Sequence, residues 1–156
     1  MGRSTLKSSR SGIFEVLAGW PVWAAALWWG SLTTLVFGVV PLLFMHLPSK
    51  SLAGNTAASL FGVQALASVL FGAALLLASN GRKMADYSAR ARSVRGVVLA
   101  GMLLALLVEF AVAPRIVVRQ NLALWHTVGS LMLLAQWLCA GISFWVLVKP
   151  DNQTQV

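Results

Sequence analysis

The chain has 156 residues, of which 58% are hydrophobic and only 10% charged, and its formal net charge is +8. This charge content and a mean hydropathy of +0.79 exclude an ordinary soluble domain, in which about a quarter of the residues are charged. The single cysteine, Cys139, excludes an internal disulfide and a thiolate metal cluster. The basic residues lie between apolar runs without a basic-aromatic recognition motif, so the charge favours lipid head groups and no nucleic-acid partner.

Four apolar segments follow a basic N-terminal tail at residues 1–17. We predict transmembrane helices over residues 20–43, 56–78, 96–113 and 122–148, inside one domain of residues 18–148, because about 20 apolar residues cross a bilayer. Residues 149–156 form a polar C-terminal tail. The predicted fold class is an all-α integral membrane protein with four transmembrane helices in an antiparallel bundle.

Lysine and arginine are distributed unevenly between the two sides of this bundle. The two tails and the connection of residues 82–95 carry nine of the twelve, and the other side has only Lys50, Arg115 and Arg119. Cytoplasmic segments carry the excess of positive charge, so both termini are expected in the cytoplasm and the protein in a bacterial inner membrane. The basic segments would then contact anionic lipid at the cytoplasmic face.

Small and polar residues recur at helical spacing on each span. Lipid does not drive helices together, so such residues mark helix–helix contacts. The glycines expected at these contacts are Gly30, Gly38, Gly72 and Gly129.

Two prolines interrupt the apolar spans near their outer ends. Pro41 lies in the last turns of the first span, and Pro114 follows the third. Each removes a backbone donor and is expected to kink or end its helix. The outer half of the bundle is therefore expected to splay, which would leave room for a cavity.

The first span and the segment after it share a pattern with a known group of proteins. Matching positions are Gly30, Pro41, Phe44, Ala53, Gly54, Leu60 and Phe61, followed by Pro114, His126 and Ser130. This pattern resembles a bacterial family of small four-span membrane proteins, similar to the transmembrane-protein-205-like family. The sequence departs from it around residues 131–136, where an asparagine is expected. The resemblance implies the four-span topology. It does not indicate a biochemical activity.

Five polar side chains within or beside the spans are candidates for a functional cluster: His46, Gln64, Glu109, His126 and Gln136. Glu109 stands out, because an acid inside a span costs about 2.5–3.5 kcal/mol on insertion scales and usually faces a partner. Glu109 and His126 lie about one turn from the outer ends of consecutive spans, so we predict that they meet. The alternative is that Glu109 turns toward Arg115 and His126 anchors the interface.

Three functional hypotheses follow. The first is an interaction, assembly or stability factor, with a membrane-protein partner or as a homo-oligomer. The second is a small oligomeric transporter or channel that uses Glu109 and His126. The third is a metal- or haem-binding module, although His46 and His126 are its only histidines and no resident cofactor is expected. No catalytic residues are predicted, because the sequence has no nucleophile motif and no acid placed to complete a triad.

Overall fold

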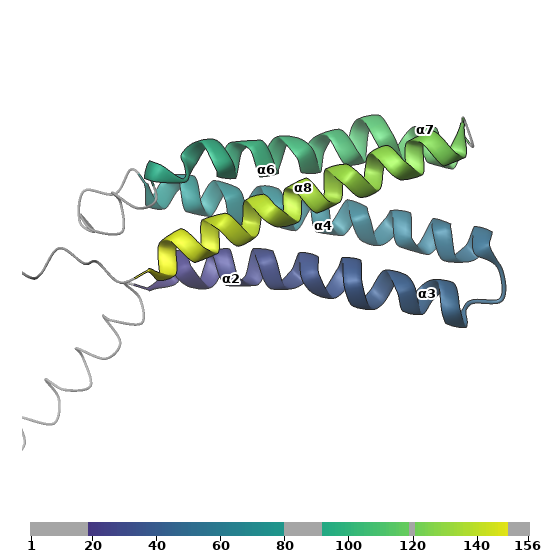
Figure 1. Ribbon diagram of the computed structural model, residues 1–156, viewed down its shortest axis with the longest axis horizontal. Helices are drawn as coiled ribbons and strands as arrows, with labels where there is room; N and C mark the ends of the chain where they lie inside the picture. Colours follow the sequence, from purple (N-terminus) through teal and green to yellow (C-terminus); the bar gives the residue numbers. More distant parts are fainter. Residues whose placement is uncertain (1–18, 80–91, 119–120, 150–156) are drawn as a thin grey trace, which may run out of the picture.

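The computed structural model describes residues 19–79, 92–118 and 121–149, and the regular elements in these ranges are helices (Figure 1). Four helical segments are long and apolar enough to cross a membrane: Trp20–His46, Lys50–Ala78, Arg95–Val117 and Ala123–Val148. The predicted fold class is confirmed. The predictions for both tails and for most of the basic connection fall outside the described residues.

The segments form two helical hairpins packed side by side. In chain order the elements are α2 (Trp20–Thr33), η1 (Thr34–Val39), α3 (Val40–His46), α4 (Lys50–Ala78), α6 (Arg95–Leu107), η2 (Val108–Val112), α7 (Ala113–Val117) and α8 (Leu122–Val148). Each long helix packs on the next one along the chain, and α8 returns to pack on α2. We call the end with α3 and α7 the distal end, and the end where α2 begins and α8 ends the proximal end (Figure 1).

Two helix boundaries differ from the sequence prediction. The second helix begins at Lys50 rather than residue 56, because Ser49 caps it: its hydroxyl accepts a hydrogen bond from the Leu52 N–H at 3.2 Å. The connection to the preceding helix is therefore only Leu47–Ser49. The third helix does not end at Pro114 but continues for one turn through α7.

Both intramembrane prolines follow a π-helical turn. In an α-helix the proline ring would clash with the carbonyl four residues earlier, which belongs to Phe37 for Pro41 and to Phe110 for Pro114. Those carbonyls lie within η1 and η2, where the wider π-helical turn makes room for the ring. Each proline thus reshapes its helix without ending it.

The proximal half holds the tightest packing. Trp28 is fully buried, and its ring lies 2.8 Å from the position that a Cβ on Gly101 of α6 would occupy. A Cβ on Gly72 would likewise meet the Met102 side chain. In the distal half, one on Gly129 would lie 3.2 Å from the Val112 side chain. Glycine at these positions lets neighbouring helices approach closely.

Gly30 and Gly38 do not lie at close helix contacts, contrary to the sequence prediction. A Cβ on either would have no neighbouring atom within 4 Å. The buried face of α2 instead carries Ala24, Ala25, Trp28 and Leu32. The physical reason is that the bulky Trp28 comes from α2, so the space for it has to come from small residues on the partner helices.

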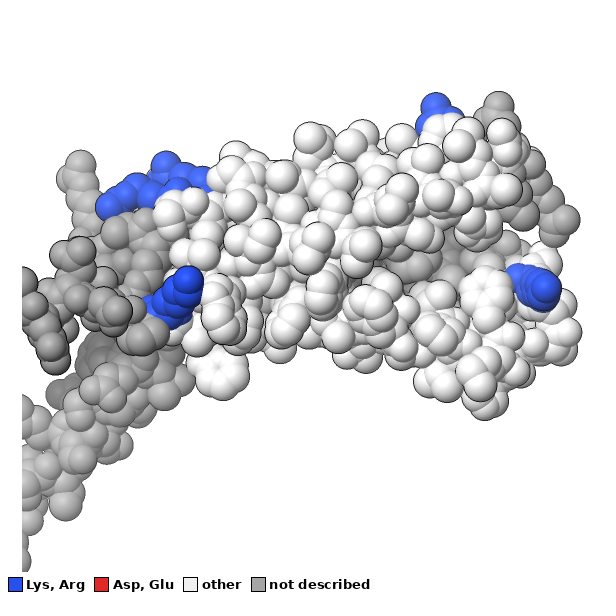
Figure 2. Space-filling model, viewed as in Figure 1, with Lys and Arg blue, Asp and Glu red and all other residues white. Residues whose placement is uncertain are grey.

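On the face drawn in Figure 2, lysine and arginine side chains lie at the two ends of the bundle and none lies between them. At the distal end the Arg115 guanidinium lies 4.5 Å from the ring centre of Trp125, and at the proximal end the Lys149 ammonium lies 5.9 Å from that of Trp145. Such cation–aromatic pairs suit the two interfaces of a bilayer. Also at the proximal end, Arg95 donates to the hydroxyl of Ser79 at 2.8 Å and to its carbonyl at 3.1 Å, which joins the start of α6 to the end of α4.

Candidate functional site

A cavity of about 160 Å³ opens in the distal half of the bundle, the half in which the two prolines lie. Its walls come from α3, α4, α7, α8 and η2, and most of them are apolar. The residues that line it are Val40, Phe44, Gly54, Ala57, Ala58, Phe61, Val108, Ala113, Ile116, His126, Gly129, Ser130 and Leu133. The cavity is thus apolar, with a few polar groups contributed by α8.

A wider space of about 580 Å³ adjoins this cavity toward the distal surface, and we call it the vestibule. The two spaces share Phe44, Gly54, Ala58, Ile116 and His126, so they lie side by side. The vestibule adds polar groups from the start of α4, namely Lys50, Ser51 and Asn55. A ligand lying across both would meet polar groups at the surface and apolar walls below.

The vestibule and the cavity open between the two hairpins. In the proximal half α2 packs on α8, whereas in the distal half no comparable packing joins α3 to α8 among the described elements. Figure 1 shows α8 rising from α2 toward α7, and Figure 2 shows the hollow that this leaves at the distal end. Val40 and Phe44 line one side of the opening, and Ser130 and Leu133 line the other.

A layer of hydrogen-bonded polar side chains lies about one turn below the cavity. Gln64 follows Phe61 by three residues on α4, and Gln136 follows Leu133 by three residues on α8. The amide Nε2 of Gln136 donates to the Ser68 hydroxyl at 2.8 Å, and that of Gln64 donates to the Ser31 hydroxyl at 3.1 Å. The Ser68 hydroxyl also accepts a longer hydrogen bond from Gln64 Nε2, at 3.4 Å, and donates to the main-chain carbonyl of Gln64 at 2.8 Å. This polar layer ties α2, α4 and α8 together where the hairpins begin to diverge.

Glu109 lies in η2, apart from the polar layer, and faces α4. Its carboxyl oxygen Oε1 would be 3.2 Å from a Cβ on Gly62, so the absent side chain of that glycine makes room for it. The other oxygen, Oε2, is buried and has no hydrogen-bond partner among the described residues. Among the described residues, the indole N–H groups of Trp28 and Trp29 are the other buried polar side-chain atoms without a partner, and Glu109 is the acid among them.

The five residues predicted to form one cluster lie in different parts of the bundle. Gln64 and Gln136 meet through Ser68, while His126 lines the cavity and Glu109 faces Gly62. No hydrogen bond or ion pair joins Glu109 to His126, although both residues are described. The predicted pairing is therefore absent from this structure, because the Glu109 side chain projects from η2 toward Gly62 of α4.

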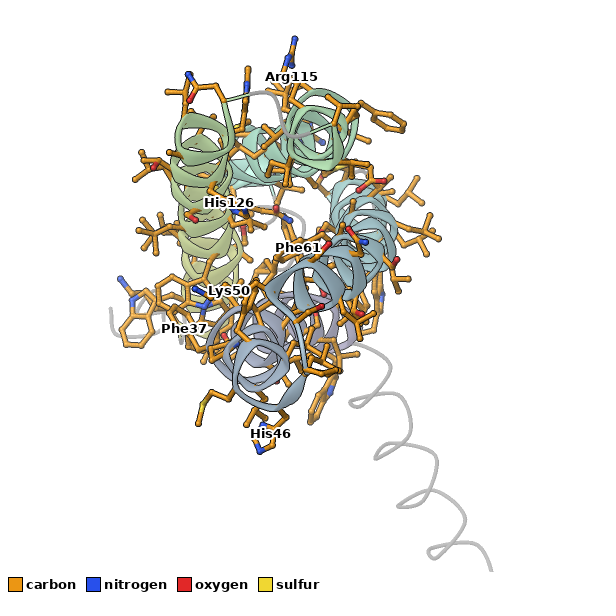
Figure 3. All side chains as sticks on the ribbon, turned by 90° about the vertical axis from the view of Figure 1, so that its right-hand side faces the viewer. Phe37, His46, Lys50, Phe61, Arg115 and His126 are labelled. Atoms are coloured by element: carbon orange, nitrogen blue, oxygen red, sulfur yellow. The ribbon has the colours of Figure 1, made fainter. Side chains whose placement is uncertain are left out.

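The remaining member of the cluster, His46, points outward. His46 is exposed, and its Nδ1 lies 3.0 Å from the Leu42 carbonyl. Figure 3 looks onto the distal end: His126 turns toward the space between the hairpins, whereas His46 and Arg115 point away from it. Arg115 binds the Ala111 carbonyl and lies over Trp125, so it is not the partner of Glu109 that the alternative interpretation requires.

A metal centre finds no support in this arrangement. Among the described residues no group of three or more His, Cys, Asp or Glu side chains is placed to hold an ion. His46 and His126 point in different directions, so they do not form a shared site (Figure 3).

Sequence reasoning missed the walls of the cavity and two serines of the polar layer. Ile116 and Leu133 line the cavity, but in the sequence they resemble any other apolar residue, and Phe61 stood out only as a position of the family pattern. Ser31 was missed because only the fold brings it to Gln64. Ser68 stood on the small-residue face of its helix, where its spacing of four from Gln64 was a usable signal.

Comparisons with known proteins add one family and no activity. Neither the curated proteins nor the solved structures include a match to this chain. One family model matches residues 23–123, which covers three of the four spans and reaches the start of α8, and it is described as a domain of unknown function, DUF4149. The chain therefore belongs to the DUF4149 family.

Proposed function

We propose that this membrane protein is a binding protein that holds the apolar part of an amphipathic ligand in its distal cavity. The observation that supports this most strongly is that an apolar cavity adjoins a vestibule whose lining carries several polar side chains. Small-molecule sites are typically apolar concavities with a few placed polar groups, and their usual volume range of roughly 300–1,000 Å³ includes that of the vestibule.

The contrast between the two halves of the bundle also favours binding over a continuous pore. Below the cavity, the polar layer and then the buried side chains of Trp28, Leu75 and Val98 fill the space between the helices. A ligand that enters from the distal end therefore meets a closed floor in this conformation. A ligand-binding protein differs from the three hypotheses drawn from the sequence, which were an interaction, assembly or stability factor, a transporter or channel, and a metal- or haem-binding module.

The orientation of the bundle is part of the proposal. Arg92, Arg95 and Lys149 lie at the proximal end, and the positive-inside rule then places that end in the cytoplasm of a bacterium and the vestibule at the outer surface of its inner membrane. The resemblance to the transmembrane-protein-205-like proteins suggests a wider relationship and brings no activity with it.

Photolabelling tests the proposal. The purified protein in vesicles is irradiated with a palmitic acid analogue that carries a diazirine in its chain, and labelled peptides are mapped by mass spectrometry. We expect strong labelling of residues 40–44 and 130–133. Gly54→Phe should abolish most of it, because Gly54 lines both spaces and a Cβ there meets no atom within 4 Å.

Gly30→Phe is the matched control for this experiment. A Cβ on Gly30 also meets nothing within 4 Å, but Gly30 does not line the cavity or the vestibule. Labelling that is uniform along all lipid-facing helix surfaces, or that survives Gly54→Phe, would refute the proposed function.

A second candidate is a small cation-coupled transporter, and the unpartnered Oε2 of Glu109 favours it. A cation held by this carboxyl group would supply the missing partner. In proteoliposomes with an imposed gradient, cation flux should then disappear in Glu109→Gln. Equal flux in the variant and the parent protein would rule this candidate out.

A further inference from the structure

We propose that the ligand of the distal cavity is a membrane phospholipid with an anionic head group, held with its phosphate in the vestibule and part of one acyl chain in the cavity. This inference rests on the proposed function and adds the chemical class of the ligand. Four features of the distal end support it: charge, depth, access and size.

The charge of the vestibule is complementary to an anion. Lys50 and His126 line it together with Asn55, and Glu109, the only acidic residue in the described part of the chain, is not among its lining residues. The 29-residue helix α4 also begins at Lys50, so the positive end of its dipole lies beside the vestibule. A phosphate would meet an ammonium group, a helix N-terminus and neutral hydrogen-bonding groups there.

The depth of the cavity matches the layout of a lipid. Gly54 and Phe61 lie roughly 6 and 16 Å along α4 from Lys50, at 1.5 Å per residue. The head-group layer of a bilayer is several Å thick, so a cation at its level places the cavity among the acyl chains. A molecule bound across both spaces therefore needs a charged head and an apolar chain directly below it.

Access is lateral, from the membrane. The opening between α3 and α8 faces sideways out of the bundle, and its edges carry the apolar side chains of Phe44 and Leu133. The helix surfaces around it are also apolar, as in the exposed Met45 and Leu131. A lipid can enter through this opening without its chain leaving the hydrocarbon.

The size of the cavity suits a segment of chain rather than a whole lipid. An apolar cavity of about 150 Å³ takes up benzene, so the 160 Å³ of this one corresponds to a short stretch of methylene groups. The remainder of the lipid would stay in the bilayer and in the vestibule. Such partial insertion gives selective but exchangeable binding.

Native mass spectrometry of the full-length protein tests the inference. The protein is released from mixed micelles that contain equal amounts of palmitoyl-oleoyl phosphatidylglycerol and phosphatidylcholine, and the retained lipids are counted. We expect phosphatidylglycerol to be retained about fivefold over phosphatidylcholine, in line with the contribution of one lysine near a lipid phosphate. Lys50→Gln should remove most of this preference.

Lys149→Gln is the matched control, since it removes a lysine that is equally exposed but lies at the proximal end. Loss of the preference in this variant as well would overturn the inference, because any surface charge would then suffice. Gly54→Phe should reduce the retention of both lipids, and Ala58→Phe replaces it if the first variant does not fold.

The outcomes separate the two proposals. If both lipids are retained equally and both are lost in Gly54→Phe, the cavity binds acyl chains without distinguishing the head groups. In that case only this inference fails. If retention is unchanged by filling the cavity, the proposed function fails with it.

Discussion

Single residues determine how closely the helices pack, and the largest effect comes from Trp28. Trp28 is completely buried, and it occupies the space that a side chain at position 101 would need. The small-residue ladder of α2 suggested that Gly30 serves this purpose, but it faces open space. Spacing alone does not reveal which of two facing helices contributes the large side chain.

Gly101→Ala should therefore destabilise the bundle, by about 1–3 kcal/mol, because an extra methyl group in a packed site forces its neighbours to move. Its Cβ would lie 2.8 Å from Trp28 and 3.2 Å from the Cβ of Cys139. Thermal unfolding followed by size-exclusion chromatography in detergent measures the change. Gly30→Ala is the control and should be neutral or slightly stabilising, because alanine favours helix. Equal loss in both variants would mean that backbone flexibility, rather than packing, controls the effect.

The polar layer makes a second prediction at the residue scale. Ser68→Ala removes the hydroxyl to which Gln136 donates and leaves that buried amide without its bond. Stability should fall by about 1–2 kcal/mol, at the upper end for interhelical hydrogen bonds in membranes. Ser59→Ala on the same helix is the control, since Ser59 is exposed and bonds only the carbonyl of Asn55. The double variant Ser68→Ala with Gln136→Leu should recover part of the loss, and a further loss would contradict this account.

At the scale of elements, the two π-helical turns set the shape of the distal half. The sequence predicted a disturbance at Pro41 and Pro114, because a proline ring cannot fit into a regular helix. It did not predict that both helices would absorb the proline and continue to His46 and Val117. The turns that follow the prolines, α3 and α7, contain no buried residue, so burial of the next turn does not explain why each helix continues.

Pro114→Ala should convert η2 into regular helix and narrow the distal opening. Restoring the normal hydrogen bonds would remove a change of direction of about 20°, which displaces the end of the five-residue α7 by about 3 Å. Spin labels at Met45 and Val117, in a Cys139→Ala background, measure this shift by pulsed electron resonance, and both sites are exposed. A proximal pair at Leu77 and Leu99 should not move. An unchanged distal distance would show that other contacts hold the hairpins apart.

The candidate site was predictable only in part. Glu109 and the two glutamines attract attention in the sequence because polar side chains are rare in spans. The fold then separates them, since the glutamines face the centre of the bundle and Glu109 faces Gly62. The depth of a residue along a helix follows from counting, but its direction around the helix near a π-helical turn does not.

At the scale of the whole molecule, the distribution of charge predicts the orientation. Reporter fusions after residue 85 and at the C-terminus should be active as cytoplasmic reporters, and fusions after Lys50 and Gln120 as external ones. Alkaline phosphatase and green fluorescent protein are a suitable pair, because each is active on only one side. If the reporter after residue 85 is active outside the cytoplasm, the proposed orientation is wrong and the vestibule faces the cytoplasm.

The contact between Arg95 and Ser79 suggests that the protein can assemble from two separate fragments. It joins the two hairpins at the proximal end independently of the covalent chain between them, and the packing of α4 on α6 extends the same contact along the bundle. Each hairpin is a pair of antiparallel spans that can enter the bilayer as a unit. The gene should therefore tolerate being cut between the codons for residues 85 and 86, with the two fragments finding each other in the membrane when expressed together.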